Sequence, residues 1–154
     1  MTHQLADLWE DLVDELGDER EAVVVRSEEH GERRLTHTEL EARANRLAHH
    51  LRACGGGVGS TVGCHVHNGT EYLEALLAAY KLRAVPINVN YRYVEDELRY
   101  LFADAGIRAV VHDAEFAPRM AAIRDQLPDL AVELATGEDY EAALAAADPA
   151  PAFE

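Results

Sequence analysis

The sequence predicts an α/β fold in which a mostly parallel sheet is flanked by helices. Short runs of β-branched and apolar residues alternate along its 154 residues with longer segments whose apolar side chains recur at helical spacing. The alternation is clearest over residues 62–89, where a strand, a helix and a second strand follow one another. Such a unit requires parallel strands joined by a right-handed crossover. A chain of this length has room for one domain with a substantial core.

The first third of the chain predicts a helix, a β-hairpin and a second helix. Residues 22–25 and 33–35 suit two strands, and Gly31 between them can adopt the positive φ of a tight turn. Thr36 and Glu39 form a capping box at the start of the second helix. The apolar stripe of the first helix consists of Leu5, Leu8, Trp9, Leu12, Val13 and Leu16. The stripe of the second helix consists of Leu40, Ala44, Leu47, Ala48 and Leu51.

The central unit combines strands over residues 62–67 and 85–89 with a well-marked helix between them. Asn68 can cap this helix, and Glu71 stands three residues later in the capping-box position. Its large apolar side chains fall on one helix face and are Leu73, Leu76, Leu77 and Tyr80.

A helix, a strand and another helix follow the central unit. Carboxylates crowd residues 95–97, where they favour the positive end of a helix dipole. The buried face of that helix is expected to be Leu98, Leu101, Phe102 and Ala105. A strand over residues 107–112 precedes a helix that carries Phe116, Met120, Ile123 and Leu127.

The chain is expected to end with a weaker strand, a helix and a linker. Residues 131–135 suit the strand, and Thr136 with Asp139 can open the alanine-rich helix. We therefore assign residues 1–147 to one α/β unit and the proline-rich residues 148–154 to a linker.

Composition excludes several classes of protein. The formal net charge of −15, with only 14 Lys and Arg residues, argues against general binding to nucleic acid or anionic membranes. No apolar run is long enough to span a bilayer. Two cysteines, Cys54 and Cys64, are too few for a disulfide framework, so we expect a cytoplasmic protein with reduced thiols.

Two stretches of the sequence resemble a known family. Residues 81–101 read Lys-Leu-Arg-Ala-Val-Pro-Ile-Asn-Val-Asn-Tyr-Arg-Tyr-Val-Glu-Asp-Glu-Leu-Arg-Tyr-Leu, and residues 35–40 read Leu-Thr-His-Thr-Glu-Leu. Both resemble the early part of AMP-forming acyl-CoA synthetases, which belong to the adenylate-forming superfamily. The sequence of residues 88–93 is nearer to fatty-acid or steroid-side-chain CoA ligases than to amino-acid adenylation domains.

The resemblance implies a parent enzyme that converts a carboxylic, fatty-type acid, ATP and CoA to acyl-CoA, AMP and pyrophosphate, with Mg²⁺ on the nucleotide. Such enzymes use a Ser/Thr/Gly-rich phosphate loop ending in Pro-Lys-Gly, an aromatic-x-Thr-Glu motif, a ribose-binding Asp and a C-terminal lysine. None of these motifs occurs in the sequence, whose single lysine is Lys81. We therefore expect the chain to be the N-terminal portion of such an enzyme and to be inactive alone, with no cofactor bound.

The loop after the second central strand is the candidate binding region. Ligands bind open α/β sheets at the carboxyl ends of the strands. In the family this loop lies beside the route of CoA entry, which makes Asn90, Tyr91 and Arg92 candidate CoA-lining residues, with Arg119 a weaker candidate for the CoA phosphate. The alternative is that Arg92 and Arg119 simply pair with surface acids, which is the commoner role of arginine in an acidic chain.

Three other motifs have plainer interpretations. Residues 55–59 are rich in glycine but leave a helix and enter a strand, so they predict a turn rather than a phosphate loop. His65 and His67 could share a strand face as a metal pair, but no further ligand cluster completes a site. Asp113 follows a strand as a phospho-acceptor would, but it lacks the partners of such a site, so a helix cap is expected.

Two other functional classes stay open. The chain could be a free-standing, non-catalytic module that binds a partner protein, or a small-molecule-binding α/β domain. If it is part of a synthetase, its partner is the remainder of that enzyme, and an exposed sheet edge could also support a homodimer.

Overall fold

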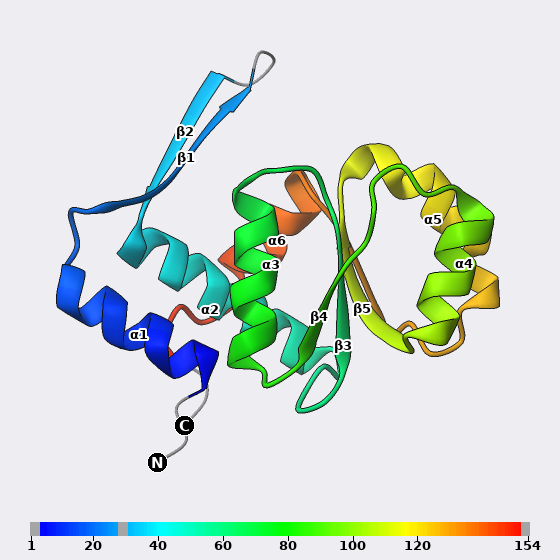
Figure 1. The fold of residues 1–154 in the computed structure, drawn as a ribbon, viewed down its shortest axis with the longest axis horizontal. Coiled ribbons are helices and arrows are strands. Elements are labelled where there is room, and N and C mark those ends of the chain that lie inside the picture. Colours follow the sequence, from blue (N-terminus) through cyan, green and yellow to red (C-terminus); the bar gives the residue numbers. More distant parts are fainter. Residues whose placement is uncertain (1–3, 28–30, 152–154) are drawn as a thin grey trace.

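The computed structural model describes residues 4–27 and 31–151, and it confirms the predicted parallel sheet (Figure 1). Four strands pair in parallel in the order β4-β3-β5-β6. Their bounds are β3 (Thr61–His65), β4 (Val85–Asn88), β5 (Ile107–His112) and β6 (Val132–Ala135). The register places Cys64 opposite Asn88 and His65 opposite His112. The carboxyl ends of the strands therefore meet at one edge of the sheet.

Helices cover both faces of the sheet (Figure 1). One face is covered by α2 (His37–Ala53), α3 (Thr70–Lys81) and α6 (Glu138–Ala145). The other is covered by α4 (Glu95–Asp104) and α5 (Ala117–Ile123). Short 3-10 turns flank α5, and they are η1 (Ala114–Phe116) and η2 (Arg124–Gln126). No helix in the described residues is long and apolar enough to cross a bilayer.

A hairpin and the first helix lie outside these layers (Figure 1). The predicted hairpin is confirmed, with β1 (Glu21–Ser27) antiparallel to β2 (Gly31–Thr36) and Ser27 opposite Gly31. Its turn, residues 28–30, lies outside the described residues. Helix α1 (Leu5–Leu16) packs against α2 and α3. Much of its predicted apolar stripe faces solvent, because Leu5 is 59% exposed and Leu8 53%, whereas Val13 is buried.

Of the three helix starts predicted from capping-box spacing, one is confirmed and two are wrong. The Thr36 hydroxyl accepts from the Glu39 N–H at 3.1 Å, and the Glu39 carboxylate accepts from the Thr36 N–H at 2.8 Å. Helix α3 begins instead after Gly69, with no side-chain cap from Asn68. Helix α6 begins after Gly137 rather than at Thr136. In both cases the residue before the helix is a glycine. Gly69 has extended backbone, and Gly137 has a positive φ.

The buried faces of α2 and α5 follow prediction, that of α4 does so in part because Leu101 and Ala105 are half-buried, and those of α1 and α3 differ from it. All five apolar residues predicted for α2 are buried, as are Leu98 and Phe102 of α4 and all four predicted residues around α5. The large residues predicted for α3, Leu73, Leu76, Leu77 and Tyr80, are only half-buried. This helix buries its small residues Ala75, Ala78 and Ala79, together with Glu74 and Lys81.

The residues after α6 lie along α2 rather than apart from the domain. The Asn45 side-chain amide donates to the Pro149 carbonyl at 3.0 Å, and a ring nitrogen of His49 lies 3.1 Å from the Ala150 carbonyl oxygen. The described part of the expected linker is therefore non-helical but held against the fold.

Candidate functional site

The loops at the carboxyl edge of the sheet form the candidate site. Strand β3 leads into α3 on one face, whereas β5 leads into η1 and α5 on the other. Because the chain leaves these two adjacent strands in opposite directions, a crevice opens between their ends. Open α/β sheets bind ligands at such a topological switch point.

A cavity of about 710 Å³ lies between the loops that follow β3 and β4. It is lined by Val66, His67, Asn68, Tyr72, Asn88, Val89, Asn90, Tyr91, Tyr93 and Leu101. Two of the four residues selected from the sequence, Asn90 and Tyr91, are therefore in its wall. Asn90 also shapes the loop, because its side-chain oxygen accepts from the Arg92 N–H at 3.0 Å.

The two candidate arginines take different places. Arg119 donates from Nη1 to the carbonyls of Tyr91 and Tyr93, each at 3.1 Å, and its guanidinium lies 5.3 Å from the centre of the Phe116 ring. Arg92 is exposed, and its Nε donates to the Tyr91 hydroxyl at 3.2 Å. Within the described ranges neither forms an ion pair with an acid, so the surface-pair alternative is not what these side chains do. Arg119 fixes the loop that Arg92 extends from.

A second cavity, of about 780 Å³, lies on the other side of the loop after β3. Its wall includes Arg33 from the hairpin, Thr70 at the start of α3, and Glu71, which pairs with Arg33 at 2.8 Å. His67 and Asn68 line both cavities. The loop after β3 is thus the partition between them.

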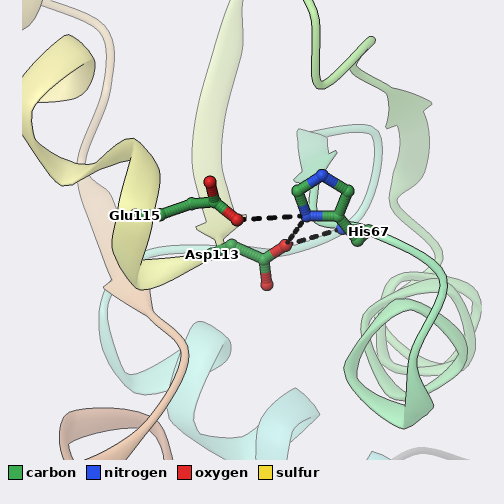
Figure 2. A group of neighbouring side chains, drawn as sticks. All are labelled: His67, Asp113 and Glu115. Carbon is green, nitrogen blue, oxygen red and sulfur yellow. Dashed lines mark hydrogen bonds and ion pairs between the residues drawn. The ribbon is translucent and has the colours of Figure 1, made fainter. Parts of the chain in front are cut away.

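His67 is the centre of a cluster at the switch point (Figure 2). Its Nδ1 lies 2.7 Å from Asp113 Oδ2 and 3.5 Å from Glu115 Oε1. Asp113 Oδ2 also accepts the backbone N–H of His67 at 2.7 Å. The His67 ring is tilted against Tyr91 and Phe116, at centroid distances of 4.7 and 5.2 Å. These contacts fix the imidazole at the edge shared by both cavities.

The structure tests three interpretations from the sequence analysis, and it overturns the predicted cap by Asp113. His65 and His67 do not act as a pair, because His65 is fully buried and stacked on Phe116 at 4.4 Å. Burial lowers the pKa of His65 to about 4. Asp113 precedes η1 but its side chain does not cap it, since the carboxylate bonds His67 instead. The glycines of residues 55–59 form the predicted turn after α2, at the opposite end of the sheet.

The sequence analysis considered His67 and Asp113 in separate motifs and did not predict that their side chains are in contact. Strands β3 and β5 are neighbours although β4 lies between them in the chain. Only that strand order brings the residues after each strand end together. Glu115 carried no signal of its own, since it stands on a polar turn among many acids.

Comparisons with known proteins agree with the fold and its motifs. The chain matches the family of AMP-binding enzymes over residues 11–152. It is 38% identical to a 3-oxocholest-4-en-26-oate–CoA ligase of Rhodococcus rhodochrous, over all of this chain and 29% of that protein. It is 41% identical to the medium-chain acyl-CoA ligase Mig of Mycobacterium avium, over 79% of this chain and 26% of that protein. The chain thus spans less than a third of either relative.

Solved structures show the same arrangement. The N-terminal domain of FACL13 from Mycobacterium tuberculosis superposes with a TM-score of 0.87 over 98% of this chain and 38% of that one, at 23% identity. Apo MatB from Rhodopseudomonas palustris gives a TM-score of 0.77 at 30% identity, over 97% of this chain and 30% of that one. The chain therefore belongs to the AMP-binding enzyme family and corresponds to the N-terminal portion of an acyl-CoA synthetase.

Proposed function

We propose that this chain is the opening part of an enzyme that joins a carboxylic acid to CoA through an acyl adenylate, with release of AMP and pyrophosphate. The observation that carries the proposal is the family match over residues 11–152 together with ligase relatives 38–41% identical. Those relatives are named for fatty and steroid acids, so a fatty or steroid-side-chain acid is the substrate class we propose. ATP with Mg²⁺ and CoA are the cosubstrates of the complete enzyme.

The isolated chain should not catalyse adenylation. Phosphoryl chemistry of this kind needs cations clamped on the phosphates. The sequence lacks the family's phosphate loop, and its single lysine, Lys81, is buried between Glu10 and Glu41 at 2.5 and 2.6 Å. Lys81 therefore has a structural role, and we expect no nucleotide to bind tightly to this chain alone.

The loop after β4 is the part we assign to CoA. Asn90 and Tyr91 line an open cavity at the carboxyl edge, and Arg92 extends from the same loop into solvent, where it is free of acidic partners among the described residues. Arg92 is thus the side chain best placed for an anionic group of CoA. We assign Arg119 an indirect role, because its hydrogen bonds to the Tyr91 and Tyr93 carbonyls hold in place the loop that carries Arg92.

The rest of the synthetase is the partner we propose for the exposed apolar surface. Leu5, Leu8 and Leu12 of α1 are 59, 53 and 40% exposed, and Val85 of the edge strand β4 is 48% exposed. Exposed large apolar side chains on one helix and on an edge strand are features of interaction surfaces. The same surface is the observation that favours the alternative, a free-standing module that binds another protein or a second copy of itself.

A graft tests the proposed function directly. These 154 residues would replace the matching stretch of the Rhodococcus rhodochrous ligase, with the same ligase lacking that stretch as the control. We expect acid-dependent formation of acyl-CoA by the graft and none by the control. The isolated chain should show no carboxylate-dependent ATP–pyrophosphate exchange. A folded but inactive graft, or exchange by the isolated chain above a protein-free blank, would overturn the proposal.

Variants of the graft test the CoA loop. We expect Arg92→Ala to raise the KM for CoA with little change in the KM for ATP, since we propose that this side chain contacts CoA and not ATP. The matched control is Arg99→Ala, which removes an exposed arginine from α4 that pairs with Asp96 at 2.9 Å. Equal changes in the KM for CoA in the two variants would show that Arg92 does not bind CoA.

A further inference from the structure

We infer that His67, Asp113 and Glu115 form a binding site for a divalent transition-metal ion, with Zn²⁺ as the best-suited ion. The side chains come from the two strand ends that border the topological switch point (Figure 2). Their candidate ligand atoms all lie within 4.8 Å of one another. The cluster adjoins the cavity assigned to CoA, because His67 lines both cavities, but its three ligands are not among the residues proposed to bind CoA. The inference can therefore fail or succeed independently of that proposal.

The spacing of the ligand atoms fits a metal ion. Nitrogen and oxygen ligands bound at about 2.0–2.2 Å from zinc lie about 3–3.5 Å from one another. The Nδ1 of His67 lies 2.7 Å from Asp113 Oδ2 and 3.5 Å from Glu115 Oε1. Both separations therefore require only small adjustments. Glu115 has the freedom to make them, because its side chain is 67% exposed.

The charges around the cluster also favour a cation. Arg33 pairs with Glu71 at 2.8 Å and lies 3.8 Å from Glu141, so these two acids of the same cavity are compensated. Among the residues that the structure describes, the ion-pair partner of Asp113 and of Glu115 is His67. One imidazole can carry at most one positive charge, whereas the two carboxylates carry two negative charges. A divalent ion would neutralise this pair.

An orphaned hydroxyl in the same cavity is an independent observation. Thr70 is 1% exposed and lines the same 780 Å³ cavity as the three ligands, yet its Oγ1 has no hydrogen-bond partner among the residues that the structure describes. Buried polar groups are normally satisfied, and a water molecule is the usual partner where protein groups are missing. Because this oxygen is almost closed off from the cavity, the Thr70 side chain would have to turn toward the cluster for a metal-bound water to supply the hydrogen bond. The cavity is large enough for such waters.

The ligand set selects the class of ion. Imidazole nitrogen suits zinc and its neighbours, and the two carboxylates are harder ligands that zinc, cobalt and manganese also accept. Three protein ligands leave at least one coordination position for water. Without metal, His67 Nδ1 carries the proton that it donates to Asp113. Metal binding at Nδ1 requires the tautomer that carries the proton on Nε2, so the ion would replace the hydrogen bond between His67 and Asp113.

The bound ion would join two loops that lead to opposite faces of the sheet. The loop after β3 carries His67, and the loop after β5 carries Asp113 and η1 with Glu115. Crosslinking them would fix the wall between the two cavities. We therefore expect metal to raise the melting temperature of the chain, by mass action on the folded state.

The test is a titration of the untagged chain with Zn²⁺ by calorimetry, and with Co²⁺ followed by its visible absorption. We expect one ion per chain and a shift of the His67 ring-nitrogen resonances in NMR. Glu115→Gln and Asp113→Asn should each weaken binding at least tenfold and abolish the zinc-dependent rise in melting temperature. Both are nearly isosteric, and Glu115 is exposed, so circular dichroism should show an intact fold.

The matched control is the double variant His49→Gln and His50→Gln, which removes two adjacent histidines from α2. It should bind Zn²⁺ as the wild type does. The inference is overturned if the wild type takes up no ion, if the control loses the site, or if the Glu115 and Asp113 variants bind as tightly as the wild type.

Discussion

The two helical layers of the molecule bury different chemistry. Between the sheet and α4 with α5 the core is apolar except for the buried His65, and its apolar members are Val89, Leu98, Phe102, Ile107, Val110, Met120, Ile123, Leu127 and Leu130. On the other face, α3 meets the sheet through alanines, and charged groups are buried among the helices. Arg43 bonds Glu74 at 2.8 Å, and Glu74 accepts the Tyr140 hydroxyl at 2.6 Å.

The charged layer is stabilised by ion pairs and hydrogen bonds between its side chains rather than by buried apolar surface area. Glu74 is fully buried. The burial of Tyr140 and the neighbouring charge of Glu74 raise the pKa of Tyr140 well above its usual range. Burial opposes the charge on Arg43, but its hydrogen bonds to Glu141 and Glu74 raise the pKa of the guanidinium overall. Each of these groups is tolerable only while the others are present. In the apolar layer, by contrast, each side chain contributes the area it removes from water.

The largest effect should come from the apolar layer. Phe102→Ala removes a ring that is 2% exposed, and should lower the free energy of unfolding by about 3–5 kcal/mol. Urea denaturation measures this change. The control is Tyr100→Ala on the same helix, where the ring is 71% exposed and the loss should stay below about 0.5 kcal/mol. Similar losses at both positions would mean that the layer is not packed as described.

The buried lysine should give the next effect. Lys81 joins Glu10 of α1 and Glu41 of α2, and its side chain is 1% exposed. Lys81→Met leaves two neighbouring carboxylates without a cation and should lower the free energy of unfolding by about 3 kcal/mol. Breaking a buried ion pair typically costs about 3–5 kcal/mol, and we expect the lower value because Glu10 keeps contact with water. Adding Glu41→Gln to this variant should restore part of the loss. A double variant less stable than Lys81→Met would refute mutual dependence in this layer.

The pH dependence of stability should single out His65. Its folded pKa of about 4 lies below the ordinary value of 6.5, so between these pH values the unfolded chain binds a proton that the folded chain does not. Stability is therefore full above pH 6.5 and falls as the pH is lowered, by about 2 kcal/mol between pH 7 and pH 5.

Denaturation at both pH values checks this, with His65→Leu as the comparison. The variant should lose most of that pH dependence, and the remainder is expected from His50, whose pKa is also lowered by burial. An unchanged slope in His65→Leu would show that other groups carry the effect.

The smallest effect should come from the exposed stripe of α1. Leu8→Ser changes a side chain that is 53% exposed and should alter the free energy of unfolding by less than about 0.5 kcal/mol. The same substitution in the grafted ligase should be more damaging, because there we propose that the stripe is covered. Equal stability of wild-type and Leu8→Ser grafts would argue that α1 stays exposed.

The sequence by itself determined the order and type of the elements. Short apolar runs rich in β-branched residues predicted every strand of the sheet, and apolar side chains at helical spacing predicted the helices between them. The spacing of apolar residues also predicted the buried faces of α2 and α5, and half of that of α4. The motif at residues 81–101 indicated the family through its residues alone.

Tertiary structure alone decided what the helix α3 buries and how the site assembles. A periodic pattern favours Leu73 and Leu77 over Ala75, Glu74 and Lys81, but a close helix contact needs small residues, and a buried charge is stable only beside a partner from another element. The same holds for His67 and Asp113, which stand 46 residues apart in the chain. The strand order β4-β3-β5 joins them, and that order is set by packing on both faces of the sheet rather than by any local signal.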